Sequence, residues 1–220
     1  MSRLVPTSAH SRGFPPTASA LPLAAPGAST SDQPERLTSA PLDVEASLRG
    51  EPLRILFIAA EGTPYVKTGG MADVIGALPR ALSRMGHDVR VALPRYKAVD
   101  AQRWRLRLAQ RKLAVPIGRR NELVDVYETR QDDGVRVHFI DAPEYFNRER
   151  LSNYQDDGDR FILFSRAVME FTRKGDWAPD VIHCHDWHTG VAPNWMKTIY
   201  RNDPLLKDAA SVYTIHNLAY

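Results

Sequence analysis

The feature that most constrains the fold is a continuous apolar run, RILFIAA at residues 54–60, followed by a glycine-containing loop. Such a run is typical of a strand buried on both faces of a parallel sheet. Apolar residues then recur at helical spacing over residues 71–85, where Pro79 is expected to kink the helix and Gly86 to end it. A second strand is predicted at residues 88–94. Strand, helix and strand within about 40 residues predict a βαβ unit with a right-handed crossover.

The rest of the chain continues this alternation of strands and helices. A helix is predicted to begin near Asp156 or Asp157, and Thr189 is expected to cap another. Alternating strands and helices indicate an α/β fold with a doubly wound, Rossmann-like parallel sheet. The further strands are predicted at residues 112–117, 122–129, 134–141, 180–186 and 211–217.

The first part of the chain has a different composition. Residues 1–50 are rich in Pro, Ser, Ala and Thr and carry no acidic residue before Asp32. They offer little apolar surface for a core, so we expect a disordered extension before a folded domain at residues 51–220. The hydroxyl-rich, acid-poor composition also fits a transit peptide, although only Arg3 and Arg12 precede Asp32. That alternative would place the protein in a plastid.

Composition excludes some classes of function. The net charge is only +3, with scattered Lys and Arg, so nucleic acid is not an expected partner. No apolar stretch approaches the roughly 18 to 20 residues of a membrane helix, so no membrane association is expected. The single cysteine, Cys184, excludes an internal disulfide.

Three polar clusters follow predicted strands: residues 61–70, residues 185–189, and His216 with Asn217. Ligands of doubly wound sheets bind beyond the carboxyl ends of the strands. The three clusters therefore predict one binding site formed by three loops.

The first cluster contains Lys67-Thr68-Gly69-Gly70 directly before the predicted helix. Free N–H groups at a helix N-terminus attract anions, and glycines let a phosphate approach the backbone. The segment matches neither a Walker motif nor GxGxxG. Two interpretations remain open: an anion site, or a solvated lysine beside a structural turn.

The second cluster, HCHDWHTG at residues 183–190, is rich in potential metal ligands. Alternation along a strand places His183 and His185 on one side and Cys184 on the other, which disfavours a tetrahedral metal site. The alternatives are buried histidines satisfied by hydrogen bonds, or a sugar site in which Asp186 and His188 bind hydroxyl groups.

Three segments together resemble a known family. KTGGMADVIGALPRAL, HCHDWHTGVAP and TIHNLAY, in this order, closely resemble bacterial glycogen synthases and plant starch synthases. The family usually has leucine where Met71 stands, a change that nearly conserves volume. The first segment resembles the bacterial version more closely, which favours a cytoplasmic protein over a plastid one.

The resemblance implies a retaining glucosyltransferase that uses ADP-glucose and extends an α-1,4-glucan, with no cofactor and no metal. It implies that Lys67 binds ADP-glucose and that Gly69 and Gly70 let the helix N-terminus face the diphosphate. Family members consist of two Rossmann-like halves in the GT-B arrangement, and residues 53–220 resemble only the N-terminal half.

The resemblance also implies roles on the sugar side. Asp186 and His216 correspond to the residues that the family implicates in catalysis, where they would orient sugar hydroxyls. Tyr154, in the segment SNYQD, corresponds more loosely to a substrate-binding tyrosine. His188 is a further candidate for contact with sugar.

The missing half leaves two hypotheses about function. The chain is expected to be a fragment of a glycogen synthase and inactive alone, because half of the cleft is absent. The alternative is a non-catalytic module that binds glucan or nucleotide.

Overall fold

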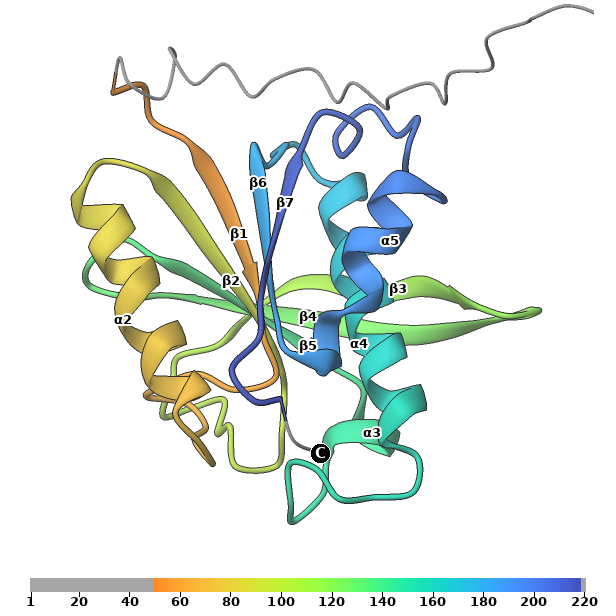
Figure 1. Ribbon diagram of the computed structural model, residues 1–220. Helices are drawn as coiled ribbons and strands as arrows, with labels where there is room; N and C mark the ends of the chain where they lie inside the picture. The colour runs from red at the N-terminus through yellow and green to blue at the C-terminus, as the bar shows by residue number, and fades with distance from the viewer. Residues whose placement is uncertain (1–49, 219–220) are drawn as a thin grey trace, which may run out of the picture. The chain divides into compact units, whose positions relative to one another are not determined.

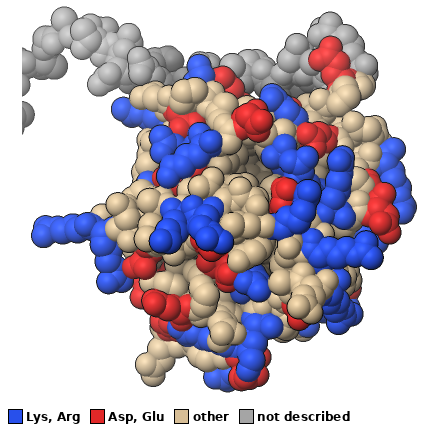
Figure 2. Space-filling view, turned by 180° about the vertical axis from the view of Figure 1, so that it is seen from behind, with Lys and Arg blue, Asp and Glu red and all other residues tan. Residues whose placement is uncertain are grey.

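The computed structural model describes residues 50–218 (Figure 1). The predictions of a disordered extension at residues 1–50 and of a transit peptide concern residues that, apart from Gly50, lie outside the described ones. Within the described residues, no helix is both long enough and apolar enough to cross a membrane. On the face shown in Figure 2, Lys and Arg side chains are interspersed with Asp and Glu.

The described residues form a seven-stranded sheet in the order β3-β4-β5-β2-β1-β6-β7. Five adjacent strands run parallel to one another, namely β5, β2, β1, β6 and β7. Strand β7 lies at the edge of the sheet. The strands are β1 (Arg54–Ile58), β2 (Asp88–Pro94), β3 (Arg107–Ile117), β4 (Arg120–Arg130), β5 (Arg136–Asp141), β6 (Val181–His185) and β7 (Ala210–Thr214).

Helices cover both faces of the sheet. The chain passes from β1 through α2 to β2 in one direction, and then through α4, β6 and α5 to β7 in the other. Helix α2 lies on one face, and α4 and α5 lie on the opposite face (Figure 1). The prediction of a doubly wound α/β fold is therefore confirmed. The helices are α2 (Met71–Arg84), α3 (Pro143–Phe146), α4 (Asp157–Lys174), α5 (Val191–Lys197) and the short 3-10 helix η1 (Trp187–Thr189).

The predicted parallel sheet carries an antiparallel extension at one edge. Strand β4 runs antiparallel to both β3 and β5, so the sheet is mixed. A two-residue turn joins β3 to β4, and its Gly118 has φ +60°. Residues with positive φ suit such turns, whereas a parallel pair needs a long crossover. A turn at Asp132-Asp133-Gly134 joins β4 to β5, and the Gly134 N–H donates to the Gln131 carbonyl at 2.9 Å.

Helix α2 ends as its sequence predicts. Gly86 adopts φ +98°, its N–H donates to the Ser83 carbonyl, and the His87 N–H donates to the Leu82 carbonyl. These two bonds make a Schellman motif, which favours glycine in the left-handed position. The helix runs through Pro79, which is buried within it. The β1–α2–β2 unit therefore fixes where the glycine loop lies at the carboxyl end of β1.

The expected caps of two other helices differ from those observed. Asp156 is the N-cap residue of α4, but its side chain makes no capping hydrogen bond and pairs with Arg148 instead. The Thr189 hydroxyl donates to the carbonyl of His185 at 2.9 Å, and Gly190 takes the N-cap position of α5. A hydroxyl that bonds backward in this way stabilises the turn after β6 rather than the next helix.

Candidate functional site

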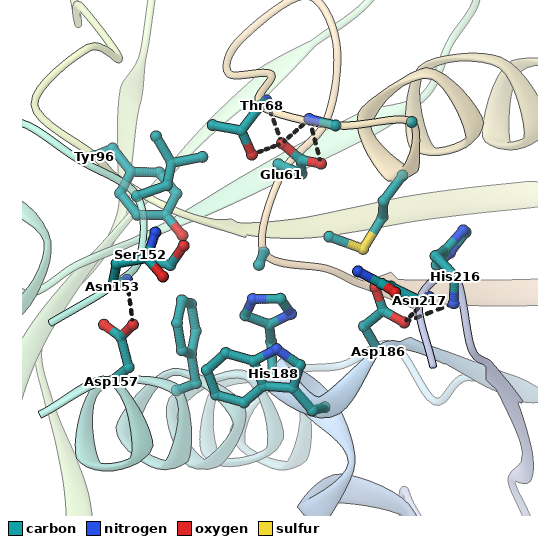
Figure 3. A pocket seen from close by; sticks show the side chains of 17 residues that line it. Glu61, Thr68, Tyr96, Ser152, Asn153, Asp157, Asp186, His188, His216 and Asn217 are labelled. Atoms are coloured by element: carbon teal, nitrogen blue, oxygen red, sulfur yellow. Dashed lines mark hydrogen bonds between the residues drawn. The ribbon is translucent and has the colours of Figure 1, made fainter. Parts of the chain in front are cut away.

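A cavity of about 460 Å³ lies at the carboxyl ends of the parallel strands. Figure 3 shows Tyr96, Asn153 and Asp157 on one side of it, facing Asp186 and His216 on the other. The loops after β1, β6 and β7 all contribute, so the prediction that the three polar clusters converge is confirmed. The lining residues are Ala60, Glu61, Thr68, Gly69, Gly70, Met71, Tyr96, Leu151, Ser152, Asn153, Asp157, Phe161, Asp186, Trp187, His188, His216 and Asn217.

The glycine loop is held by a carboxylate that sequence reasoning did not identify. Glu61, only 4% exposed, accepts hydrogen bonds from the Thr68 N–H at 2.5 Å, the Thr68 hydroxyl at 2.7 Å and the Gly69 N–H at 3.2 Å. Two of the amides expected to face an anion are therefore already bonded within the protein. The N-terminus of α2, where Gly70 is the N-cap residue, remains directed at the cavity.

Gly70 has no structural requirement to be glycine. Its φ of −70° is accessible to any residue, and a Cβ placed there would meet no atom within 4 Å. Backbone strain and packing therefore do not explain the residue. Glycine at this position leaves the helix N-terminus unobstructed on the side of the cavity.

Lys67 lies beside this loop but is not among the residues that line the cavity. Its Nζ is 2.7 Å from each carboxylate oxygen of Asp73, and both side chains are more than half exposed. Exposed pairs of this kind contribute at most about 1 kcal/mol. The pair with Asp73 therefore leaves the ammonium group available to exchange partners at little energetic cost.

Asp186 connects two of the three loops. Its side chain follows β6 and is 3% exposed, and its Oδ1 accepts the backbone N–H of His216 at 2.6 Å. The backbone of Asp186 has φ 55° and ψ 179°, a conformation that non-glycine residues rarely adopt and that costs about 1 to 3 kcal/mol. Strain of this kind persists only where surrounding contacts fix it, and it is common at functional sites.

His216 ends a row of three imidazoles. Its Nε2 lies 2.9 Å from Nδ1 of His185, whose ring lies 4.1 Å from that of His183 between centroids. The predicted placement of His183 and His185 on one side of β6 is confirmed. Burial, followed by the charges of the two neighbouring histidines, lowers the pKa of His185 to about 3. A neutral His185 therefore fixes the ring of His216 at the edge of the cavity.

His188 presents a neutral imidazole to the cavity. Its ring packs against Phe161 with centroids 4.5 Å apart and stacks on Trp187 at 4.1 Å. Burial is the main cause that lowers the pKa of His188 to about 4. Its Nδ1 has no hydrogen-bond partner within the described part of the chain, so it can bond a ligand hydroxyl.

Tyr154, proposed from the resemblance, is not among the lining residues. Its hydroxyl accepts the N–H of Arg150 at 3.0 Å. The neighbouring Asn153 and Asp157 line the cavity instead, joined by a hydrogen bond of 2.7 Å from the Asn153 N–H to Asp157. Proximity in sequence did not reveal which of these side chains faces the cavity.

Tyr96 is a further lining residue that the sequence did not suggest. It is 2% exposed, and its hydroxyl has no hydrogen-bond partner among the described residues although buried polar groups nearly always have one. Burial raises its pKa, so the group is a neutral donor and acceptor. It lies across the cavity from Asp186 (Figure 3).

Among residues 50–218, no group of three or more His, Cys, Asp and Glu side chains is arranged to hold a metal ion. The groups that line the cavity are suited to hydrogen bonding: a helix N-terminus, carboxylates, imidazoles and a phenol. Such a combination suits a ligand that carries both an anionic group and several hydroxyls.

Comparison with known proteins agrees with this chemistry. Residues 54–220 match the family described as the starch synthase catalytic domain. Glycogen synthases from Desulforamulus reducens and Geobacillus thermodenitrificans are 45% and 44% identical over 168 and 169 residues, which is 76% of this chain but 35% and 34% of theirs.

A solved structure, the catalytic domain of starch synthase IV from Arabidopsis thaliana bound to ADP and acarbose, superposes with a TM-score of 0.70. The sequence identity is 33%, over 76% of this chain and 34% of that one. This chain thus spans about a third of the length of these relatives. By sequence and by structure, the chain belongs to the starch synthase catalytic domain family.

Proposed function

We propose that this chain comes from the N-terminal half of a GT-B glycosyltransferase. In this proposal the whole enzyme transfers glucose from ADP-glucose to the 4-hydroxyl at the non-reducing end of an α-1,4-glucan, with retention of configuration. The observation that carries the proposal is the convergence of the glycine loop, Asp186 and His216 on one cavity in a chain of this family. The solved relative bound to ADP supports the nucleotide, because ADP is the leaving group of the proposed donor.

The donor diphosphate would meet the N-terminus of α2. Breaking the bond between glucose and phosphate leaves negative charge on the diphosphate, which preorganised donors and cations stabilise. Gly70 leaves room for this approach, and Lys67 would exchange Asp73 for phosphate. The fixed Glu61 carboxylate would hold the loop in place while those groups act.

The transferred glucose would lie between Asp186, His216 and His188. Positive charge develops on the sugar ring as the bond to phosphate breaks. A carboxylate and imidazoles can orient hydroxyl groups and stabilise that charge without acting as acid or base. Tyr96, with its unbonded hydroxyl, would add a further hydrogen bond from the opposite side.

The remaining two-thirds of the relatives' length would supply the facing wall of the cleft. Water then reaches the reacting centre of this chain alone, and the diphosphate is only partly stabilised. A cytoplasmic location is part of the proposal, because the glycogen synthases named above come from bacteria.

The test compares two glycine variants of the 220-residue chain by calorimetric titration with ADP-glucose. Gly70→Ala adds a methyl group where nothing lies within 4 Å, so the fold should persist while ADP-glucose affinity falls at least tenfold. Gly158→Ala is the matched control, because its Cβ is equally unobstructed and the residue does not line the cavity. Wild-type affinity in Gly70→Ala would refute the proposed approach of the diphosphate to the helix N-terminus.

Two further observations distinguish the half-enzyme proposal from the alternative of a non-catalytic module. The half-enzyme proposal expects no incorporation of labelled glucose from ADP-glucose into glycogen by this chain alone. It also expects the reading frame after codon 220 to encode a second α/β domain. A stop codon there would favour the module, and turnover comparable to an intact synthase would contradict the half-cleft account.

A further inference from the structure

A second cavity, of about 330 Å³, lies between α4 and the sheet. Its floor is formed near the amino ends of β2 and β5, where Arg90 and Arg136 lie, whereas the first cavity lies at the carboxyl ends. Leu108 of β3 and Trp177, after α4, complete its walls. None of its lining residues lines the first cavity, so the proposed transferase chemistry does not account for it.

His138 is the buried polar group of this cavity. It is 4% exposed, and neither ring nitrogen has a hydrogen-bond partner among residues 50–218. Its ring packs against Phe171, which also lines the cavity, with centroids 5.0 Å apart. Desolvation, followed by the charges of Arg90 and Arg136, lowers the pKa of His138 to about 3. The buried imidazole therefore has two unused hydrogen-bonding groups beside the cavity.

Two guanidinium groups face the same space without a salt bridge in the described structure. Arg90 stacks on Trp177, with its Cζ 4.1 Å from the ring centroid, and its buried Nε has no hydrogen-bond partner there. Burial and then the charge of Arg136 lower the pKa of Arg90, while the charges of Asp88, Asp176 and Glu128 act in the opposite direction. The Trp177 ring is itself fixed, because its Nε1 donates to Asp88 at 2.7 Å.

The charges of Asp88, Asp176 and Glu128 attract Arg90, although no salt bridge joins any of them to it in the described structure. Glu128 accepts a hydrogen bond from Arg107 at 3.3 Å, so its charge is already shared. Asp176 is exposed and forms no salt bridge with another described residue. A ligand with two negative charges would complement Arg90 and Arg136 better than either carboxylate does.

We propose that this cavity binds the phosphoryl group of a small phosphate monoester. The guanidinium groups of Arg90 and Arg136 bind the phosphate oxygens, and His138 donates one N–H to the ligand. A dianionic phosphate matches two cations, whereas a carboxylate carries a single charge. Ligand pockets begin at roughly 300 Å³, so there is room for an organic part against the apolar side chains of Leu108 and Phe171.

The test titrates the 220-residue chain with glycerol 3-phosphate and with inorganic phosphate, followed by calorimetry and by the histidine NMR signals. The signal of His138 is assigned through its loss in His138→Gln. Glycerol 3-phosphate should bind more tightly than inorganic phosphate and shift the His138 signal. Arg136→Gln should weaken its binding by about 10- to 150-fold, the range for loss of a hydrogen bond to a charged group.

Arg201→Gln is the matched control, because it removes the same charge from an exposed arginine outside the cavity. Arg90→Lys is the second variant, to be used if Arg136→Gln fails to fold. It keeps the charge but loses the planar guanidinium group, and it should also weaken binding of glycerol 3-phosphate. Equal affinity for the two probes would assign the cavity to free phosphate and overturn the monoester. An unchanged His138 signal at millimolar concentrations of both probes, or an equal loss in Arg201→Gln, would overturn the site itself.

Discussion

The carboxylate of Asp186 accepts the backbone N–H of His216 across 2.6 Å, joining the end of β6 to the loop after β7. The same Oδ1 accepts a longer bond of 3.4 Å from the Asn217 N–H. One buried side chain thus fixes the position of a proposed catalytic residue that lies 30 positions further along the chain. The stability of the chain and its affinity for donor are therefore expected to depend together on Asp186.

Replacing Asp186 with alanine should lower both the stability of the chain and its affinity for ADP-glucose. Asp186→Ala leaves the N–H of His216 without its acceptor, so we expect the free energy of unfolding to fall by about 1 to 3 kcal/mol. ADP-glucose affinity should fall as well, because His216 is no longer held in place. Urea denaturation and calorimetry measure the two effects. Asp208→Ala is the control, since its 87% exposed side chain should tolerate removal; an equal loss in that variant would contradict the assigned role.

Removing the hydroxyl of Tyr96 should separate binding from stability. The hydroxyl has no partner within the described residues, so Tyr96→Phe should leave the thermal midpoint unchanged or raise it, while ADP-glucose affinity falls. Tyr200→Phe is the converse control, because the Tyr200 hydroxyl donates to Glu170 at 2.9 Å and its loss should lower the midpoint. Wild-type affinity in Tyr96→Phe would exclude the hydroxyl from the proposed site.

Loss of Lys67 should weaken donor binding with little effect on folding. The exposed pair with Asp73 contributes at most about 1 kcal/mol to stability, whereas a charge-assisted contact to phosphate is worth about 1.5 to 3 kcal/mol. Lys67→Ala should therefore weaken ADP-glucose binding about 10- to 150-fold. Lys67→Arg should restore it only in part, because the guanidinium group is larger and planar.

Lys97→Ala provides the comparison for Lys67, because Lys97 is a similarly exposed lysine paired with Glu149. Calorimetric titration of the three variants, with circular dichroism to verify folding, distinguishes the outcomes. If Lys67→Ala binds ADP-glucose as well as Lys97→Ala does, Lys67 is only a solvated neighbour of the turn.

Stability should fall as the pH decreases below about 6.5. Burial lowers the pKa of His138 and His185 to about 3 and that of His188 to about 4, from an ordinary value of 6.5. As the pH falls, these three histidines are therefore protonated in the unfolded chain before they are protonated in the folded one. Each histidine contributes stability that is fully present above pH 6.5, declines by about 1.4 kcal/mol per pH unit, and is lost once the pH falls through its folded value.

Urea denaturation between pH 4.5 and 7.5 measures this slope. His138→Gln should reduce the slope below pH 6.5 by about 1.4 kcal/mol per pH unit, because one proton fewer is taken up on unfolding. A slope identical to that of the unaltered chain would show that His138 already binds its proton in the folded state.

The sequence predicted the elements whose signals are local. The apolar run of β1, the helical periodicity of α2 and the glycine that ends it lie next to one another in the chain, and each was confirmed. The convergence of the loops followed from a general property of parallel sheets. Gly69, Gly70, Asp186, His188 and His216 were placed correctly at one cavity on that basis.

Other features depend on contacts that no local pattern encodes. The roles of Glu61 and Tyr96 follow from where side chains point after the chain has folded. Lys67 and Tyr154 belong to the correct segments but do not line the cavity, since the orientation of a loop side chain is set by partners such as Asp73.

The position of β7 at the sheet edge has a consequence for handling the protein in solution. Among the described strands, β7 pairs with β6 alone, and Val212, Tyr213 and Ile215 on or beside it are 43%, 42% and 55% exposed. An open edge with exposed apolar side chains is a template for adding a further strand from another molecule. Aggregation of this chain at high concentration should therefore begin at β7. A lysine or proline introduced into this strand should reduce it.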